Sequence, residues 1–376
     1  MISLINSFKE ITRYKKTEDK FKKIVIFTEN NNYSFFFKEI VDKLLINNIP
    51  ISIISSDKND IFLNYKNENL NVFIIESFFL LQYFFSNIKC ENFIMTTPDL
   101  GNGIINKSPF TKNYLYIFHS LISTTVAYKK NAFKNYDSFF CPSKIHRKEL
   151  EEFFFNEKKK KYFFEIGYPK IKELKSYRPI NTDRKNKILI APTWGSDSAI
   201  NKKEIFLLIE KLLEKKYIVI FRPHPMSFEK DKNSINSIIN KYKYHENFKL
   251  SSDKDNSEVF FNCEFLITDW SGSAIEFSLA FQKPSIFLNT NQRIRNKDIK
   301  KGDKILDTTF ENICRSEIGV ILKTENFGEI DKKLENLAQN LNQFREKIIN
   351  FEYKNLYNTE DSLDKTVKEI IKFYEG

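Results

Sequence analysis

From Lys22 onward, short apolar runs alternate with longer stretches of helical character, and this alternation constrains the fold more than any other feature. The runs have the length of strands, and the stretches between them have the length of helices. Such alternation is typical of βαβ units and a parallel sheet. The expected strands of the first half are 24–28, 51–54, 72–75, 93–96, 114–118 and 138–141.

The alternation is interrupted by a lysine-rich patch at 158–161 and by a polar stretch at 176–187 that contains Pro179. A second series begins at Lys187, so we place a linker at this stretch. The 376 residues suffice for two compact domains, because single cores stop growing well below that length. The second series has expected strands at 188–192, 217–222, 264–268 and 285–288, and expected helices near 203–215, 228–240 and 273–282.

The predicted organisation has four parts, of which the two central ones are Rossmann-like. In chain order they are a basic amphipathic segment (1–23), a first α/β domain (24–180), a second α/β domain (187–325) and a helical tail (326–376).

Charge and cysteine content narrow the class of protein. The formal net charge is +11, and a basic surface favours an anionic partner such as a nucleic acid, an anionic membrane or a phosphorylated substrate. No nucleic-acid motif is present and the lysines are spread along the chain, so we expect no nucleic-acid partner. The cysteines show no CxxC spacing, which favours neither a zinc site nor disulfides and fits a reducing cytoplasm. They are Cys90, Cys141, Cys263 and Cys314.

The first segment bears on membrane attachment. Apolar residues recur there at roughly helical spacing, and lysines and arginine follow them. This pattern suits a short helix on an anionic bilayer, at the inner face of the plasma membrane. The alternative is a helix packed against the rest of the protein. Neither a signal peptide nor an apolar run long enough to span a membrane is visible, so we expect a cytoplasmic protein. The apolar residues are Ile2, Leu4, Ile5, Phe8 and Ile11.

Three segments that directly follow expected strands carry polar side chains. They are Phe118-His119-Ser120, Arg222-Pro223-His224-Pro225 and Thr268-Asp269-Trp270-Ser271-Gly272-Ser273. Ligands of open α/β sheets bind beyond the carboxyl ends of the strands, so these segments are the candidate site.

The third segment leads straight into an expected helix. Backbone N–H groups and the hydroxyls of Ser271 and Ser273 would form a pyrophosphate pocket at the helix N-terminus. Plain helix capping explains the same residues equally well, since Ser and Asp are preferred caps.

The other two segments each place a histidine after a strand. His224 stands beside Arg222 in a loop stiffened by two prolines, which suits contact with a leaving phosphate. His119 precedes Ser120 and an expected helical stretch, and it suits a general base for an acceptor hydroxyl. We expect the remaining histidines, His146 and His245, to lie at the surface.

Several segments resemble, in order and spacing, the CDP-glycerol glycerophosphotransferase family, whose members polymerise teichoic acid and related capsule chains on a GT-B fold. They span roughly residues 115–290. The resemblance implies two Rossmann-like doubly wound domains facing a central cleft, with the acceptor in the first and the nucleotide donor in the second. The segments are Gly167-Tyr168-Pro169, Ile188 to Trp194 (ILIAPTW), Arg222 to Pro225, Leu266 to Phe277 (LITDWSGSAIEF) and Lys283-Pro284.

The resemblance also implies roles for single residues. His119 matches the histidine of the family's His-Gly motif, the expected base, and His224 matches the histidine that contacts the donor phosphates. Ser271 matches a serine that holds the pyrophosphate, and Glu276 matches the acidic residue expected on the ribose. The remaining expected donor-side residues are Thr193, Arg222, Asp269, Gly272 and Ser273, and Ser120 is expected on the acceptor side.

This sequence departs from the family pattern at three positions. Ser120 replaces a glycine, Gly272 replaces the second motif serine, and Trp270 replaces a tyrosine. The first change puts the acceptor geometry in question. The second removes a hydroxyl unless Ser273 substitutes for it.

The expected function is transfer of a polyol-phosphate or sugar unit from a cytidine-nucleotide donor to a hydroxyl of a polysaccharide or lipid-linked, teichoic-acid-like acceptor. The alternatives are a GT-B glycosyltransferase for CMP-linked or other nucleotide sugars, a nucleotide-sugar epimerase, and a basic RNA-binding or membrane scaffold. No cofactor is expected beyond the donor. No metal is expected either, since the one DxD, Asp253-Lys254-Asp255, lies in a charged loop.

Overall fold

The computed structural model describes residues 2–103, 105–177, 186–251 and 257–376. The chain forms two compact units. The first unit comprises residues 1–120, 128–169 and 357–376, and the second comprises 121–127 and 170–356. Most of the expected linker, including Pro179, lies outside the described residues. The second unit already begins at Lys170, ahead of the expected start of the second domain, and the last 20 residues return to the first unit.

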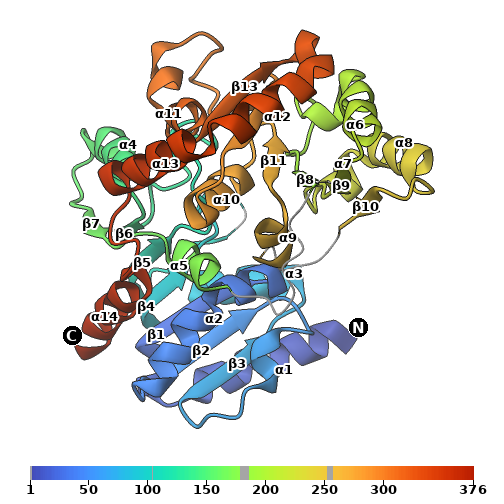
Figure 1. Ribbon diagram of the computed structural model, residues 1–376. Helices are drawn as coiled ribbons and strands as arrows, with labels where there is room; N and C mark the ends of the chain where they lie inside the picture. The colour runs from blue at the N-terminus through green and yellow to red at the C-terminus, as the bar shows by residue number, and fades with distance from the viewer. Residues whose placement is uncertain (1, 104, 178–185, 252–256) are drawn as a thin grey trace. The chain divides into compact units, whose positions relative to one another are not determined.

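The first unit is built on a seven-stranded sheet of order β3-β2-β1-β4-β5-β6-β7 in which all neighbouring strands are parallel (Figure 1). The strands are β1 Ile24–Glu29, β2 Ile51–Ser55, β3 Leu70–Ile74, β4 Cys90–Met95, β5 Thr111–Ile117, β6 Ser138–Cys141 and β7 Tyr162–Glu165. The helices are α1 Ile2–Lys16, α2 Asn31–Ile46, α3 Phe78–Asn87, α4 Lys144–Phe154 and α14 Ser362–Glu375, with 3₁₀ turns η1 Asp19–Lys22 and η2 Ile61–Asn64.

Both faces of this sheet are covered, which explains why its strands read as continuous apolar runs. On β1, Ile24 and Ile26 join the cluster formed with α2 and α14. Phe27 points to the other face, where its ring meets Phe85 of α3 edge-on at 4.9 Å between centroids. Figure 1 shows α14, in red, beside the blue strands and helix of the same unit.

The second unit repeats the architecture with a six-stranded parallel sheet of order β10-β9-β8-β11-β12-β13. The strands are β8 Lys187–Ile190, β9 Ile218–Phe221, β10 Phe248–Leu250, β11 Phe265–Thr268, β12 Ser285–Asn289 and β13 Gly319–Lys323. The helices are α5 Pro169–Ser176, α6 Glu204–Glu214, α7 Ser227–Lys230, α8 Lys232–Tyr242, α9 Ser257–Asn262, α10 Ser273–Phe281, α11 Phe310–Glu317, α12 Ile330–Gln339 and α13 Leu341–Asn355, and the 3₁₀ turns are η3 Ala199–Asn201, η4 Lys304–Thr308 and η5 Thr324–Glu329.

Two doubly wound Rossmann-like units are therefore confirmed. The residues expected as a helical tail contain α12, α13 and α14, which are divided between the two units. The expectation of a helix after Ser120 is wrong. Residues 121–135 contain turns and no helix. In the first of these turns the Ser123 hydroxyl accepts from the amides of Thr125 and Val126, and the Ser123 amide donates to buried Glu311 at 2.8 Å.

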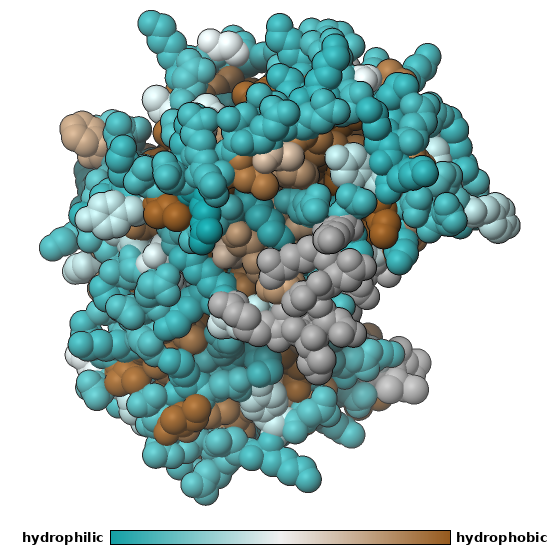
Figure 2. All heavy atoms as spheres, in the orientation of Figure 1, coloured by the Kyte–Doolittle hydropathy of each residue, from teal (hydrophilic) through white to brown (hydrophobic). Residues whose placement is uncertain are grey.

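The face drawn in Figure 2 is mainly hydrophilic. On the face drawn in Figure 2, apolar residues appear in separate patches among hydrophilic ones. Within the described ranges, no helix is both long and apolar enough to cross a membrane.

Candidate active site

In each sheet the chain first adds strands on one side of its first strand and then adds the remaining strands on the other side. Ligands of open α/β sheets bind at the carboxyl ends of the two strands between which this direction reverses. In the first unit the reversal falls between β1 and β4, and in the second between β8 and β11. Glu29 ends β1 and Thr96 follows β4, whereas Ala191 follows β8 and Asp269 follows β11. Several of the expected site residues follow these strands or the strands beside them.

His119 lies in the first unit, directly beyond β5 and beside the residues that follow β4. Its Nδ1 is 2.5 Å from the Thr96 hydroxyl, and the Tyr33 ring meets the imidazole edge-on at 5.0 Å between centroids. The Tyr168 phenol donates to the His119 carbonyl at 2.7 Å. Two side chains therefore contact this imidazole, and a third holds the backbone of the same residue.

Tyr168 belongs to the Gly167-Tyr168-Pro169 segment, and the geometry explains that sequence. Gly167 has a φ of 97°, and a Cβ there would lie 2.2 Å from the Tyr357 carbonyl oxygen, so only glycine fits. Pro169 begins α5, where its missing N–H is no loss. The segment thus delivers the Tyr168 phenol to the backbone of His119.

The prediction that His146 lies at the surface is wrong. This imidazole is fully buried, because Ser143 caps α4 and holds Nδ1 at 2.7 Å while the ring packs edge-on against Phe118. His245 is exposed, as expected.

Asp269 lies buried at the reversal point of the second sheet and organises the loop after β8. Its Oδ1 accepts hydrogen bonds from the amides of Thr193 and Trp270, each at 2.7 Å. Its Oδ2 accepts from the Ala199 amide at 2.8 Å and from the Ser198 hydroxyl at 3.1 Å. Both oxygens are thereby engaged by the protein, so the carboxylate shapes the loop that contains Thr193.

The serines that follow Asp269 lie at the N-terminus of α10. Gly272 is the residue before the helix, and no side chain caps it. The Ser271 hydroxyl instead accepts from the Ser273 amide at 3.3 Å and donates to the Ser273 hydroxyl at 3.1 Å. The positive end of a nine-residue helix and two hydroxyls therefore meet at this point.

Glu276 lies one turn further along α10. Its carboxylate is largely buried and forms an ion pair with Lys170 at 3.2 Å, within the same unit. A cation therefore neutralises the group that the family resemblance assigns to the ribose.

His224 is part of a second cluster, after β9. Its Nδ1 accepts from the Met226 amide at 3.1 Å, so the neutral ring carries its proton on Nε2. Burial, and then the charge of Arg293, lowers the pKa of His224 to about 4, which keeps the ring neutral at pH 7. Arg222, two residues earlier, donates from Nη1 to the Ser251 hydroxyl at 3.2 Å.

Two residues of this cluster were not predicted from sequence as site residues. The Trp194 indole lies 6.2 Å from the His224 ring between centroids, and the Arg293 guanidinium lies 3.6 Å from the centroid of the Trp194 ring. Burial, and then the charge of Arg295, lowers the pKa of Arg293. Arg293 follows β12 by four residues, so a search restricted to residues directly after strands does not find it.

A third unpredicted residue is Arg315, which is almost completely buried. Its guanidinium donates to the carbonyls of Asp269 at 2.6 Å and Leu288 at 3.2 Å, and it stacks on the Trp270 ring at 3.8 Å. It therefore ties together the carboxyl ends of β11 and β12.

Solved structures with the same fold support the assignment of GT-B. The wall teichoic acid polymerase TagF matches with a TM-score of 0.63 at 20% identity, covering 100% of this chain and 95% of that chain. The UDP-GlcNAc 2-epimerase of Methanocaldococcus jannaschii matches with a TM-score of 0.60 at 14% identity, covering 93% and 99%. The MnaA-UDP structure from S. aureus matches with a TM-score of 0.59 at 13% identity, covering 94% and 96%.

No curated protein sequence matches the chain. The family model for CDP-glycerol:poly(glycerophosphate) glycerophosphotransferases matches residues 117–361. This match confirms the resemblance stated above. Because it covers more than half of the residues, the chain belongs to this family of CDP-glycerol-type transferases.

Proposed function

We propose that this transferase moves a polyol phosphate, of the glycerol-phosphate kind, from a CDP-linked donor to a hydroxyl of a teichoic-acid-like or other cell-surface polymer. The observation that carries the donor assignment is the cluster around His224. A neutral imidazole with an Nε2–H and the cations Arg222 and Arg293 provide donors and positive charge for a diphosphate.

His119 is the proposed general base. It removes the proton of the acceptor hydroxyl, whose oxygen forms a bond to the phosphorus that bears the polyol. The bond from this phosphorus to the bridging oxygen breaks, and CMP leaves with that electron pair. His224, Ser271 and the N-terminus of α10 stabilise the charge that develops on the leaving phosphate.

Nucleotide preference is the direct test of the donor. Both tryptophans of the chain, Trp194 and Trp270, lie in the second unit, so tryptophan fluorescence reports the melting of that unit. CDP and CMP should raise the melting temperature, since ligand at about 100 times its Kd stabilises by about 2.7 kcal/mol. Stabilisation by UDP or GDP alone would overturn the cytidine assignment and favour a nucleotide-sugar transferase or an epimerase.

We propose that transfer needs no metal ion. Among the residues that the structure describes, no group of three or more His, Cys, Asp or Glu side chains could hold one. The sequence Asp253-Lys254-Asp255 lies outside those residues. Transfer should persist in EDTA, and loss of turnover that Mg²⁺ restores would contradict this proposal.

We also propose that the enzyme is cytoplasmic and lies on the anionic inner face of the plasma membrane. On α1, the side chains of Leu4, Ile5 and Phe8 are exposed by 48%, 52% and 63%, while Ile11 and Tyr14 are buried against the first unit. Ile11 and Tyr14 thus pack the helix against the protein, whereas Leu4, Ile5 and Phe8 are the residues that would contact a membrane.

The exposed apolar residues of α1 adjoin others on α3. The Ser77 amide donates to the Ser7 hydroxyl at 3.1 Å, which joins the start of α3 to this part of α1. Phe79, in the first turn of α3, is 81% exposed. We call Leu4, Ile5, Phe8, Phe78 and Phe79 the apolar patch.

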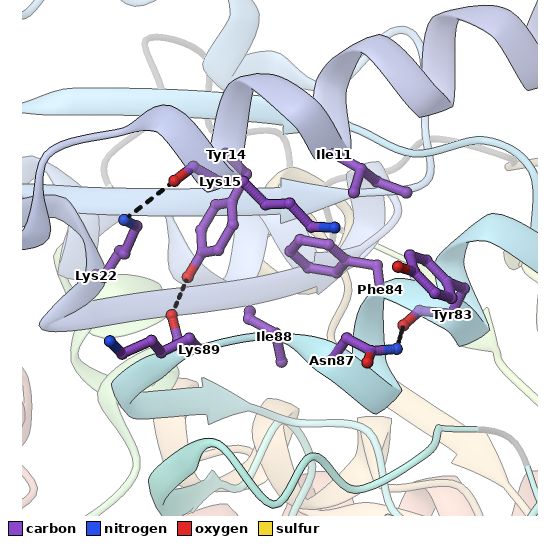
Figure 3. Close-up of a pocket in the computed structure, with 9 residues that line it drawn as sticks. All are labelled: Ile11, Tyr14, Lys15, Lys22, Tyr83, Phe84, Asn87, Ile88 and Lys89. Atoms are coloured by element: carbon purple, nitrogen blue, oxygen red, sulfur yellow. Dashed lines mark hydrogen bonds between the residues drawn. The ribbon is translucent and has the colours of Figure 1, made fainter.

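Lysines lie on α1, the helix that carries three residues of the apolar patch. Lys15, Lys22 and Lys89 line a cavity of about 160 Å³ next to the buried residues Ile11 and Tyr14 of α1 and to α3. Figure 3 shows how these side chains lie. Exposed Lys9 and Lys16 also lie on α1. Apolar groups beside lysines match a bilayer of anionic lipid.

Point substitutions test membrane binding better than deletion of α1, because deletion would uncover Phe73 and Phe84, which pack against Tyr14. A variant with Leu4, Phe8 and Phe79 all changed to Ser should bind phosphatidylglycerol vesicles roughly tenfold or more weakly. Phe155→Ser, which removes an 84% exposed aromatic outside the patch, is the matched control. Equal binding by the triple variant and the control would contradict the proposal.

A further inference from the structure

Glu29 is a carboxylate in an unusual backbone conformation at the reversal point of the first sheet. Its φ is 57°, in the left-handed region that residues with a Cβ rarely adopt. The pairing of β1 with β2 is irregular between Phe27 and Glu29, so the strand bulges just before it ends. Such conformations cluster at functional sites, where surrounding structure holds them in place.

The side chain of Glu29 reaches the loop that also contacts His119. Glu29 Oε2 accepts from the Thr97 hydroxyl at 2.9 Å, and the neighbouring residue, Thr96, contacts His119 Nδ1 at 2.5 Å. Tyr33, on the first turn of α2, meets the His119 ring edge-on. Three neighbouring strands, β1, β4 and β5, therefore bring Glu29 and His119 to the same loop.

The electrostatics of this cluster indicate the kind of ligand. Burial raises the pKa of Glu29, and the Thr97 hydrogen bond only partly opposes it. Burial and then the Glu29 charge raise the pKa of Tyr33 to about 12. The groups shown at this point are a carboxylate, a phenol-bearing ring and two hydroxyls. Such groups suit hydrogen bonds with uncharged hydroxyl groups, and an ionised carboxylate repels phosphate.

We propose that Glu29, with Tyr33 beside it, forms the subsite that binds the polyol or sugar hydroxyls of the acceptor next to the hydroxyl that reacts. This inference rests on the proposed function. The Glu29 carboxylate accepts a hydrogen bond from a neighbouring hydroxyl of the acceptor, and this contact positions the reacting hydroxyl at His119. Glu29 is a binding and positioning residue, and the proton transfer remains with His119.

The test compares Glu29→Gln with wild type in steady-state transfer from CDP-glycerol to a glycerol-terminated acceptor. The acceptor KM should rise about tenfold or more, the usual effect of losing a hydrogen bond to a charged group. Values of kcat should change far less, and stabilisation by CDP should be unchanged. Glu76→Gln, which alters an exposed carboxylate just after β3, is the matched control and should behave as wild type.

The pH dependence adds a readout that a purely structural role would not move. In wild type the acceptor KM should rise as the pH falls through the raised pKa of Glu29, because the protonated carboxyl no longer accepts as an anion. That rise should be absent in Glu29→Gln. Lower kcat with an unchanged acceptor KM, or weaker stabilisation by CDP, would overturn the inference.

Two further measurements distinguish failure of this inference from misfolding of the Glu29→Gln variant and from failure of the proposed function. If Glu29→Gln melts at a lower temperature than wild type, Thr97→Val removes the supporting hydrogen bond without changing a residue of β1 and should raise the acceptor KM by a smaller factor.

If wild type shows no transfer from CDP-glycerol, the proposed function fails. Binding of glycerol and ribitol, measured by saturation-transfer NMR on wild type and Glu29→Gln, then decides whether the subsite exists. Equal saturation transfer in the two proteins would overturn it.

Discussion

The carboxyl ends of the two sheets have the same topology and different chemistry. At the first, the groups around His119 are hydroxyls, a phenol and the carboxylate of Glu29. At the second, buried Asp269 holds the loop after β8, and the groups after β9 and β12 are the neutral His224 and the cations Arg222 and Arg293. The reversal of strand order marks a candidate site in each unit, and the residues of the loops decide which ligand each candidate suits.

The largest expected difference concerns stability. Asp269→Ala leaves buried amides and a hydroxyl of the second unit without their acceptor, so the unit should lose about 3 kcal/mol or more. The urea midpoint followed by tryptophan fluorescence measures this loss. Asp307→Ala, which alters an exposed aspartate of the same unit, should leave the midpoint within error. An unchanged midpoint together with loss of CDP binding would show instead that Asp269 contacts the donor directly.

The two histidines should separate in kinetics. His119→Ala should lower kcat roughly a hundredfold or more and leave the affinity for CDP nearly intact, the usual result of losing a general base. His224→Ala should also weaken CDP binding by roughly tenfold or more, since hydrogen bonds to charged phosphate are strong. Isothermal titration with CDP and initial rates measure the two effects. Equal losses of CDP affinity in both variants, with native-like melting, would erase the distinction between an acceptor unit and a donor unit.

The smallest effect is a pH dependence confined to the second unit. Burial lowers the pKa of His224 to about 4, below its value of about 6.5 in the unfolded chain, so unfolding takes up a proton. This contribution to stability is complete above about pH 6.5 and is lost as the pH falls toward 4. Between pH 7 and pH 5 the loss should be about 1 to 2 kcal/mol.

His224→Gln isolates that contribution from the titration of other groups. The tryptophan-detected urea midpoint of the variant should fall less between pH 7 and pH 5 than that of wild type. Parallel midpoints would mean that His224 is solvated and titrates normally, which would remove the contrast with the first unit.

The sequence predicts the buried strands well, because runs such as IVIFT and FLIT have few other uses than the centre of a parallel sheet. It misses β7, whose residues are exposed or half-buried, and β10, which has only three residues. It also misses β13, which begins with Gly319. Glycine is depleted in strands, and it is needed here because a Cβ would lie 1.9 Å from the Ser285 carbonyl oxygen. These strands are defined by pairing with their neighbours, which no local pattern reveals.

The site is only partly predictable for a related reason. His119, His224 and Ser271 lie within three residues of a strand end, so topology alone marks them as candidates. Glu29 escapes because a carboxylate at a strand end usually faces solvent, and only the bulge of β1 turns it toward Thr97. Arg293 escapes because its partner, Trp194, lies far away in the sequence.

The return of α14 to the first unit has a consequence for biosynthesis. Val367 and Ile370 complete the apolar cluster of β1 and α2, and the Asn92 side chain donates to the Phe373 carbonyl at 2.8 Å. A ribosome therefore releases the sheet of the first unit long before the helix that seals one of its faces. That face is covered only in part, by α2, while residues 170–356 of the second unit are translated, so the first unit completes its core last although its strands are made first.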